Sequence, residues 1–296
     1  MAKIAKVLQA GTMSYRLALR LQQLLADRHK SSKDVTGIQD TLILVEHFPV
    51  YTVGIRSKDF SWETEDKLVS LGADFHRTNR GGLITFHGPG QLVVYPILNL
   101  KNYKPSVRWY VSRIEQTVID ACAQLGIEAE TSVHTGVWVA DRKICAIGIH
   151  GSRFITTHGL ALNCNTDMEW FSHIVPCGIE GKEMTSLSQE LQRKIRIEEV
   201  VPIFLNSFSK LFGCILCDFP KNDADQIFKD VRNDNKTWKL HRFETSVVEV
   251  DTFWKLIQFI IIFLVTIYKD WDYLTLKKKP LRSSEMLWTV SYKLFP

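Results

Sequence analysis

The sequence lacks the marks of a secreted or membrane-spanning protein. Its six cysteines are scattered through 296 residues and follow no spacing typical of disulfide-bonded extracellular scaffolds, which favours a reducing compartment. No signal peptide is visible, because helical periodicity begins almost at once. The apolar run at 256–268 is shorter than the roughly 20 residues that a membrane-spanning helix needs, so we expect a buried or interfacial helix there.

Two common binding-site signatures are also absent. Cys214 and Cys217 form a lone CxxC pair, without the second pair of a zinc site or the βαβ context of a redox motif. The glycine-rich segment 80–91 is not followed by Lys-Ser or Lys-Thr, which excludes a Walker phosphate loop. We therefore expect these two cysteines to serve packing, and we predict no metal site.

The composition is that of a globular protein with a sizeable core. Hydrophobic residues make up 45% of the chain and charged residues 23%, and 296 residues allow one or two domains. The net charge of +5 is mildly basic, which fits an ordinary solvated surface better than a nucleic-acid-binding one. The same charge would equally suit an acidic partner protein.

Hydrophobic periodicity predicts helices interspersed with strands, and hairpins among the strands. We expect helices over 12–29, 106–125 and 197–211, strands over 40–46, 91–98 and 154–163, and a hairpin that joins 137–139 to 143–149. Thr12 or Ser14 is the expected cap of the first helix, and Pro96 marks its strand as an edge strand or as a point of exit from the sheet. The pattern predicts an α+β fold, a single domain with a central mixed β-sheet and flanking helices.

The segment after residue 219 has a different character. It opens with a charged, turn-rich stretch, continues with the apolar run and ends with three lysines, Lys277 to Lys279, and an irregular sequence. We predict a domain over 1–219 and a divergent C-terminal tail over 220–296, partly disordered, with a short apolar helix at 256–268. Contact of this tail with a membrane surface is the less favoured interpretation of the run.

Cys177 is the strongest candidate for a nucleophile. It lies between Pro176, which has a fixed φ and no N–H, and Gly178, whose missing side chain lets a substrate approach closely. Most free cysteines are small apolar core residues, but this setting suits a presented thiol better than a buried one. His173 is not its expected base, because such partners usually meet from distant segments of the chain.

The segment 80–91 is the densest group of flexible and polar residues. Its four glycines and one proline allow the backbone to approach a ligand closely, with free N–H groups facing an oxygen-rich group. Arg80 adds a positively charged fork, and His87 adds a hydrogen-bond donor or acceptor. A glycine-rich turn between two strands is the alternative, but it leaves the arginine, threonine and histidine unexplained.

Lys143 and His158 each allow a structural and a functional interpretation. A lysine at the start of an apolar strand is usually solvated, but an ammonium beside Cys177 would lower the pKa of the thiol. A desolvated lysine can also exchange protons near neutral pH as a general acid and base. His158 could orient an acyl carbonyl, or it could be a structural histidine with satisfied hydrogen bonds.

Four blocks of the sequence resemble the lipoyl(octanoyl) transferases, which move an octanoyl group from acyl carrier protein to a lysine of a lipoyl domain. The blocks, in family order, are RGGLITFHGPGQLVVYPILNL at 80–100, TGVWVADRKICAIG at 135–148, THGLALN at 157–163 and IVPCGI at 174–179. The stretch 157–191 is most similar to the animal mitochondrial form. The resemblance extends from about Val7 to Phe219 and does not include the tail.

The resemblance implies the fold of the biotin and lipoate protein ligases and a mitochondrial location. Cys177 would carry the acyl group as a thioester, and Lys143 would set the pKa of its thiol. The acyl pocket would be lined by Arg80, Gly81, Gly82, Leu83, Ile84, Thr85, Phe86, His87, Ala146, Ile147, Gly148, His158, Gly159, Leu160 and Ala161. The donor would be octanoyl-acyl carrier protein, and the acceptors would be lipoyl domains and the glycine cleavage H protein. No cofactor would be needed, because the donor is already a thioester.

Two other functions stay open at this point. An ATP-dependent lipoate or biotin ligase on the same fold would need no cysteine nucleophile, which the Pro-Cys-Gly setting argues against. A non-catalytic binding module for lipoyl domains, or a membrane-tethered scaffold, has independent support only in the apolar run at 256–268.

Overall fold

The computed structural model describes residues 2–31, 40–56, 61–175 and 181–233. They belong to a compact unit that runs from Met1 to Asn235. The helix expected at 256–268 lies outside the described residues, and so does Cys177. No helix within the described ranges has the length and apolar character of a bilayer-spanning segment.

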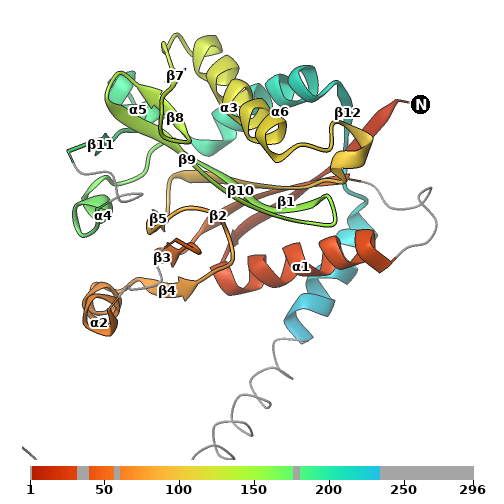
Figure 1. The fold of residues 1–296 in the computed structure, drawn as a ribbon, viewed down its shortest axis with the longest axis horizontal. Coiled ribbons are helices and arrows are strands. Elements are labelled where there is room, and N and C mark those ends of the chain that lie inside the picture. The colour runs from red at the N-terminus through yellow and green to blue at the C-terminus, as the bar shows by residue number, and fades with distance from the viewer. Residues whose placement is uncertain (1, 32–39, 57–60, 176–180, 234–296) are drawn as a thin grey trace, which may run out of the picture. The chain divides into compact units, whose positions relative to one another are not determined.

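A mixed sheet forms the centre of the described unit (Figure 1). Its strands are β1 (Lys3–Met13), β2 (Asp40–His47), β6 (Gln91–Ile97), β7 (Glu130–Thr131), β8 (Val137–Val139), β9 (Arg142–Ser152), β10 (Ile155–Asn163), β11 (Glu183–Met184) and β12 (Cys214–Asp218). They follow the order β12-β1-β2-β6-β10-β9-β8-β7, and β11 also pairs with β9. β1 runs parallel to β2 and β12, β11 runs parallel to β9, and the other neighbours are antiparallel. The α+β class and the mixed sheet predicted from the sequence are confirmed.

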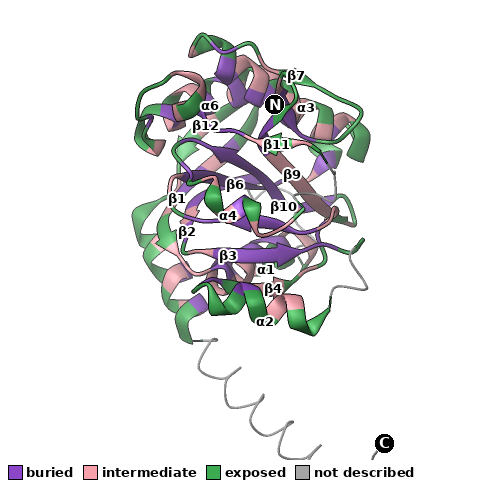
Figure 2. Cartoon of the chain, turned by 90° about the vertical axis from the view of Figure 1, so that its left-hand side faces the viewer, coloured by how far each residue is buried: buried purple, intermediate pink, exposed green. Residues whose placement is uncertain are grey.

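Helices cover both faces of this sheet. α3 (Val107–Gln124) and α6 (Ile197–Phe212) lie on one face, and α1 (Tyr15–Ser31) lies on the other (Figure 1). Successive side chains of β2 pack on opposite faces: Leu42 and Leu44 join the cluster that contains α3 and α6, whereas Ile43 joins the cluster that contains α1. A strand buried on both faces reads as a continuous apolar run, and Figure 2 shows these central strands as buried.

A smaller sheet lies beside the main one and carries the glycine-rich segment. It has the order β4 (Asp74–Arg77), β3 (Val50–Val53), β5 (Thr85–His87). A third apolar cluster packs this sheet against α2 (Trp62–Ser70) and α4 (Glu169–Ser172). The remaining short helices are α5 (Leu187–Glu190) and the 3-10 turn η1 (Leu100–Asn102).

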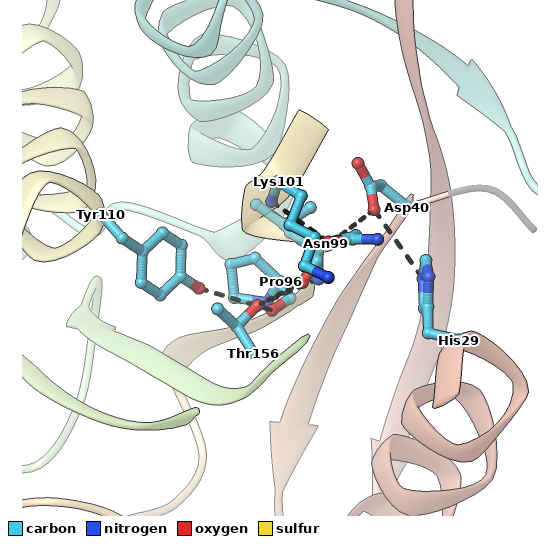
Figure 3. Close-up of polar contacts among 8 residues, drawn as sticks. His29, Asp40, Pro96, Asn99, Lys101, Tyr110 and Thr156 are labelled. Atoms are coloured by element: carbon cyan, nitrogen blue, oxygen red, sulfur yellow. Dashed lines mark hydrogen bonds and ion pairs between the residues drawn. The ribbon is translucent and has the colours of Figure 1, made fainter. Parts of the chain in front are cut away.

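A buried polar cluster fixes the end of β6 (Figure 3). The Asp40 carboxylate accepts the Asn99 N–H at 2.7 Å and lies 3.8 Å from His29 Nε2. The Thr156 hydroxyl donates to the Pro96 carbonyl at 2.6 Å, so β10 holds the same turn from its other side. Burial raises the pKa of Asp40 to about 6.

The N-terminal segment differs from its prediction. Residues 3–13 form strand β1 between β12 and β2, and α1 begins only at Tyr15. Ala5 and Val7 are buried on one face of the sheet and Leu8 on the other, a strand periodicity that the helical interpretation missed. Ser14 caps α1, since its hydroxyl accepts the Leu17 N–H and its carbonyl accepts the Ala18 N–H.

Pro96 lies where β6 has left its ladder with β10, although it still pairs with Leu42 of β2, and the interpretation as an edge strand is wrong. β6 lies between β2 and β10, but its last pair with β10 is Leu160 with Val94, two residues before the proline. The missing N–H of Pro96 therefore removes no hydrogen bond from that ladder.

The compact unit continues past residue 219, where the sequence pattern placed the domain boundary. Residues 221–233 are helical, and Ile227 and Val231 are buried in the α1 cluster. β12 precedes this helix and holds both cysteines of the CxxC pair as free thiols. Cys214 is buried in the apolar cluster beneath α6, which is the packing role that we expected. Cys217 is exposed, so the same expectation does not hold for it.

Candidate active site

A cavity of about 310 Å³ opens where the glycine-rich segment meets β9 and β10. Thirteen of the residues predicted to form the site line it: Arg80, Gly82, Leu83, Thr85, His87, Lys143, Ala146, Ile147, Gly148, His158, Gly159, Leu160 and Ala161. These residues come from three segments that are far apart in the sequence. The structure therefore brings together the glycine-rich, lysine and histidine blocks.

Three residues expected to line the cavity lie elsewhere. Ile84 and Phe86 pack in the cluster of the small sheet, where Phe86 stacks on Trp170 with ring centroids 4.9 Å apart. Because side chains alternate along this segment, the cavity receives Thr85 and His87 but not Ile84 or Phe86. Gly81 is used by its backbone, since its N–H donates to the Ile149 carbonyl at 2.9 Å.

Two glycines of the cavity wall are required by close packing of the backbone. A Cβ on Gly159 would lie 2.1 Å from the Val94 carbonyl oxygen, and a Cβ on Gly148 would lie 2.8 Å from that of Gly81. The glycine-rich segment can therefore lie directly on β9, and β10 directly on β6. These glycines shape the wall of the cavity as much as they admit a ligand.

Lys143 is buried at the beginning of β9, with 3% of its surface exposed. Its Nζ donates to the Thr135 carbonyl at 3.2 Å and lies 4.7 Å from the ring centroid of Trp138. The usual interpretation of such a lysine as a solvated strand end is therefore wrong. The ammonium faces a cavity whose described lining contains Arg56 and Arg80 and no acidic residue.

The placement of Cys177 stays a prediction, because it lies outside the described residues. The chain that follows it returns as β11, where Met184 pairs with Lys143 and the Thr185 N–H donates to the Lys143 carbonyl at 3.0 Å. This ladder ties the lysine to the segment that begins a few residues after the cysteine.

His158 is a neutral histidine with occupied hydrogen bonds, although its ring lines the cavity. Its ring Nε2 lies 2.8 Å from Asn79 Oδ1 and its ring Nδ1 lies 3.4 Å from the Tyr15 hydroxyl, while its backbone N–H donates to Gln22 Oε1. Burial, and then the charge of Arg80, lower the pKa of His158 to about 3. Its imidazole is therefore an uncharged part of the wall near neutral pH.

Sequence reasoning missed several other residues of the lining, namely Tyr15, Arg56, Val93, Tyr95, Val133, His134 and Thr135. Val93 and Tyr95 could have been found, because they are two residues apart on the strand that follows the glycine-rich segment. Arg56 and the loop 133–135 lie in irregular segments without such a period.

Thr85 carries a signal that only the structure reveals. Its hydroxyl is buried and has no hydrogen-bond partner, while the residue lines the cavity. Buried polar atoms in native proteins are nearly always hydrogen-bonded. The Thr85 hydroxyl is therefore an unpaired polar group in the wall of the cavity.

Comparisons of the sequence with known proteins agree with one another. The chain matches the lipoyl protein ligase A/B catalytic domain over residues 14–209. It is 58% identical over 211 residues to a Danio rerio protein named mitochondrial octanoyl-acyl-carrier-protein:protein N-octanoyltransferase. The aligned region covers 71% of this chain and 93% of the relative. A Homo sapiens protein of the same name is 43% identical over 219 residues, covering 71% and 94%.

Comparisons of the structure support the fold alone. A lipoate-protein ligase A bound with ATP superposes with a TM-score of 0.61 at 14% identity, over 78% of this chain and 94% of the other. A bipartite lipoate protein ligase from Thermoplasma acidophilum gives a TM-score of 0.59 at 15% identity, over 77% and 92%.

Proposed function

Because the chain belongs to the family of lipoyl protein ligase A/B catalytic domains, we propose that it is an octanoyltransferase acting in protein lipoylation. The donor is octanoyl-acyl carrier protein, and the acceptors are lysines of lipoyl domains and of the glycine cleavage H protein. The transferase names of relatives at 43–58% identity support transfer over ATP-dependent ligation. The same relatives are named mitochondrial, which supports that location for this chain.

The observation that carries the proposal is the burial of Lys143 at the cavity. A buried ammonium beside a thiol favours the thiolate, which is the nucleophilic form. The cavity volume of about 310 Å³ suits a small ligand. Ala146, Leu160 and Ala161 give it apolar surface for an acyl chain, and burial of seven methyl or methylene groups would contribute roughly 5–6 kcal/mol at most.

The reaction proceeds in two transfers through Cys177. The Cys177 thiolate attacks the donor thioester, a new thioester forms, and the thiol of the carrier protein leaves with a proton supplied by Lys143. The neutral amine of the acceptor lysine then attacks the enzyme thioester, an amide forms, and the Cys177 sulfur leaves as thiolate. The proton lost by the amine passes to Lys143, which restores the starting state.

The proposal is tested by mixing the protein with octanoyl-acyl carrier protein in the absence of ATP and measuring the intact mass. One octanoyl group should appear on Cys177 and disappear when a lipoyl domain is added. Cys177→Ala should abolish both events. A wild-type protein that stays unmodified, or one that modifies the lipoyl domain only with free octanoate and ATP, would point to the ligase instead.

A further inference from the structure

Arg80 is a buried cation that is held by the backbone of the glycine-rich segment. Its guanidinium donates to the carbonyls of Gly81 and Leu83, at 3.0 and 2.8 Å. It also donates twice to the Thr52 hydroxyl oxygen, from Nε at 3.2 Å and from Nη2 at 2.9 Å. The same Nη2 also donates to the Thr52 carbonyl at 2.6 Å. A guanidinium can only donate, so the Thr52 hydroxyl oxygen is the acceptor in its bonds with Arg80. The Thr52 O–H must therefore donate elsewhere, and His87 Nε2 lies 3.3 Å away.

The direction of these hydrogen bonds also follows independently from the other end of the network, at the Asn163 side chain. The Asn163 amide nitrogen donates to the Thr185 carbonyl at 2.9 Å, which leaves its oxygen to accept from Gln91 Nε2 at 2.9 Å. Gln91 Nε2 also donates to the Phe86 carbonyl at 3.2 Å. The Gln91 amide oxygen therefore faces His87 Nδ1, at a distance of 2.8 Å. Because an amide oxygen can only accept a hydrogen bond, Nδ1 must carry the proton.

The two ends thus define one chain in which each group donates to the next. It runs in the order Arg80, Thr52, His87, Gln91, Asn163 and the Thr185 carbonyl. All six residues are buried, and hydrogen bonds that follow one another in the same sense polarise each other. Burial, reinforced by the nearby His47 and Arg80, holds the pKa of His87 well below its ordinary value, so the ring is neutral.

This hydrogen-bond chain connects the two halves of the cavity. One end holds the glycine-rich segment through Arg80, and the other reaches Thr185, whose own N–H donates to the Lys143 carbonyl. The position of the glycine-rich segment relative to Lys143 thus depends on side chains that take no part in the reaction. A shift of about 1 Å between such groups can lower a rate 100-fold.

We propose that Thr52, Gln91 and Asn163 are positioning residues of the octanoyl-transfer site, which fix His87 as its neutral Nδ1–H tautomer and hold the glycine-rich segment in register with Lys143. The inference rests on the proposed function for its catalytic consequence. The tautomer itself needs no substrate, so it is measured separately.

The first test is the protonation state of His87 in the full-length wild-type protein, from two-bond ¹H–¹⁵N correlations. His87 should appear as the neutral Nδ1–H form at pH 7. His47 is an internal reference, because its Nδ1 lies 2.9 Å from the Met13 carbonyl and requires the same tautomer without contacting Gln91. An Nε2–H form of His87, or an imidazolium at pH 7, would overturn the proposal.

The second test interrupts the hydrogen-bond chain on either side of the His87 ring. Gln91→Met should move the His87 Nδ1–H resonance and speed its exchange with water, whereas Thr52→Val should move the Nε2 resonance; neither should move His47. Both variants should acylate about tenfold to 100-fold more slowly in a single turnover with octanoyl-acyl carrier protein. Gln116→Met, an exposed change on α3, is the control.

Unmoved His87 resonances, or acylation by Gln91→Met as fast as by the control, would refute the positioning role. If the variants do not fold, the wild-type tautomer still decides the order of the hydrogen-bond chain, without which the positioning role fails. A wild-type protein with the expected tautomer but no acylation would refute the proposed function and leave the hydrogen-bond chain standing.

Discussion

Lys143 is a cation that the fold has removed from bulk water while keeping it against a cavity. Among the described residues, its ammonium contacts a carbonyl oxygen and an aromatic face, both of which favour a positive charge without taking its proton. Such a group can stabilise a thiolate and still give up a proton during the reaction.

Lys143→Arg separates these two roles. The guanidinium keeps the positive charge but does not release its proton, so acylation by octanoyl-acyl carrier protein should fall by at least about 100-fold. Alkylation of Cys177 by iodoacetamide at pH 7 should persist, because the charge still favours the thiolate. Lys210→Arg, at an exposed lysine bonded to Asp120, should change neither rate. Full activity of Lys143→Arg would remove lysine proton transfer from the mechanism.

Thr85 offers a second comparison, between binding and stability. Thr85→Val removes a buried hydroxyl that has no partner, so the free energy of unfolding should stay the same or rise by about 1 kcal/mol. If the hydroxyl bonds to the acyl carbonyl, kcat/KM for the donor should fall about tenfold.

Thr117→Val should behave in the opposite way. Thr117 is buried, its hydroxyl donates to the Arg113 carbonyl at 2.7 Å, and it is not among the residues that line the cavity. This variant should lose about 1 kcal/mol of stability and keep its activity. A Thr85 variant that lost stability while keeping its kinetics would assign the hydroxyl to the fold alone.

At the scale of elements, the contact between β6 and β10 forms the floor of the cavity. Gly159→Ala would place a methyl group 2.1 Å from the Val94 carbonyl, so the two strands must separate. We expect a loss of about 1–3 kcal/mol of stability, typical of overpacking, measured by urea unfolding. Gly151→Ala on β9 has open space around its Cβ and should change stability by less than about 0.5 kcal/mol. Equal losses in the two variants would contradict the packing argument.

Elements with a strong hydrophobic period were predictable from the sequence, and elements without one were not. The helix capped by Ser106 and the hairpin of β8 with β9 follow directly from their patterns. β1 was missed because its residues 3–13 mix charged and small residues. Its strand form depends on parallel partners distant in the chain, β2 and β12.

The candidate site shows the same division. Resemblance of sequence blocks located Lys143 and the glycine-rich segment, and strand alternation would have removed Phe86 from the lining. No pattern could show that Gln91 and Asn163 bond to each other, because they are 72 residues apart and meet only after β6 and β10 pair.

At the scale of the whole molecule, the helix at 221–233 belongs to the compact unit. A chain ending at Asn235 should keep both stability and octanoyl transfer. A chain ending at residue 219 would lose the burial of Ile227 and Val231 and should be less stable by about 3 kcal/mol. Thermal unfolding of the two truncated proteins distinguishes these outcomes, and equal melting temperatures would place the boundary at 219 after all.

The pH dependence of stability should carry the signature of Asp40. Because burial raises the pKa of this carboxyl from 3.8 to about 6, the folded state holds its proton more tightly than the unfolded chain does. The contribution of Asp40 is fully present below about pH 4 and is lost as the pH rises through 6. Its ionisation in the fold opposes stability by roughly 3 kcal/mol at neutral pH.

Asp40→Asn should therefore gain stability relative to the wild type as the pH rises from 4 to 7.5, by about 2–3 kcal/mol in urea unfolding. Asp120→Asn is the control, because hydrogen bonds from Lys210 and Ser207 lower the pKa of that carboxyl. The stability of Asp120→Asn relative to the wild type should therefore fall as the pH rises. Parallel stability profiles for Asp40→Asn and the wild type would show that the Asp40 carboxyl is not shifted.

The tight turn between β8 and β9 has a consequence for how this enzyme could diverge. Val139 pairs with Arg142 across only two residues, Ala140 and Asp141, and this spacing seats Trp138 opposite Lys143. β9 is anchored by its long ladder to β10, so an insertion at the turn would slide β8 and leave the lysine in place. Such a chain would fold normally and keep its amine, yet would surround that amine with different neighbours.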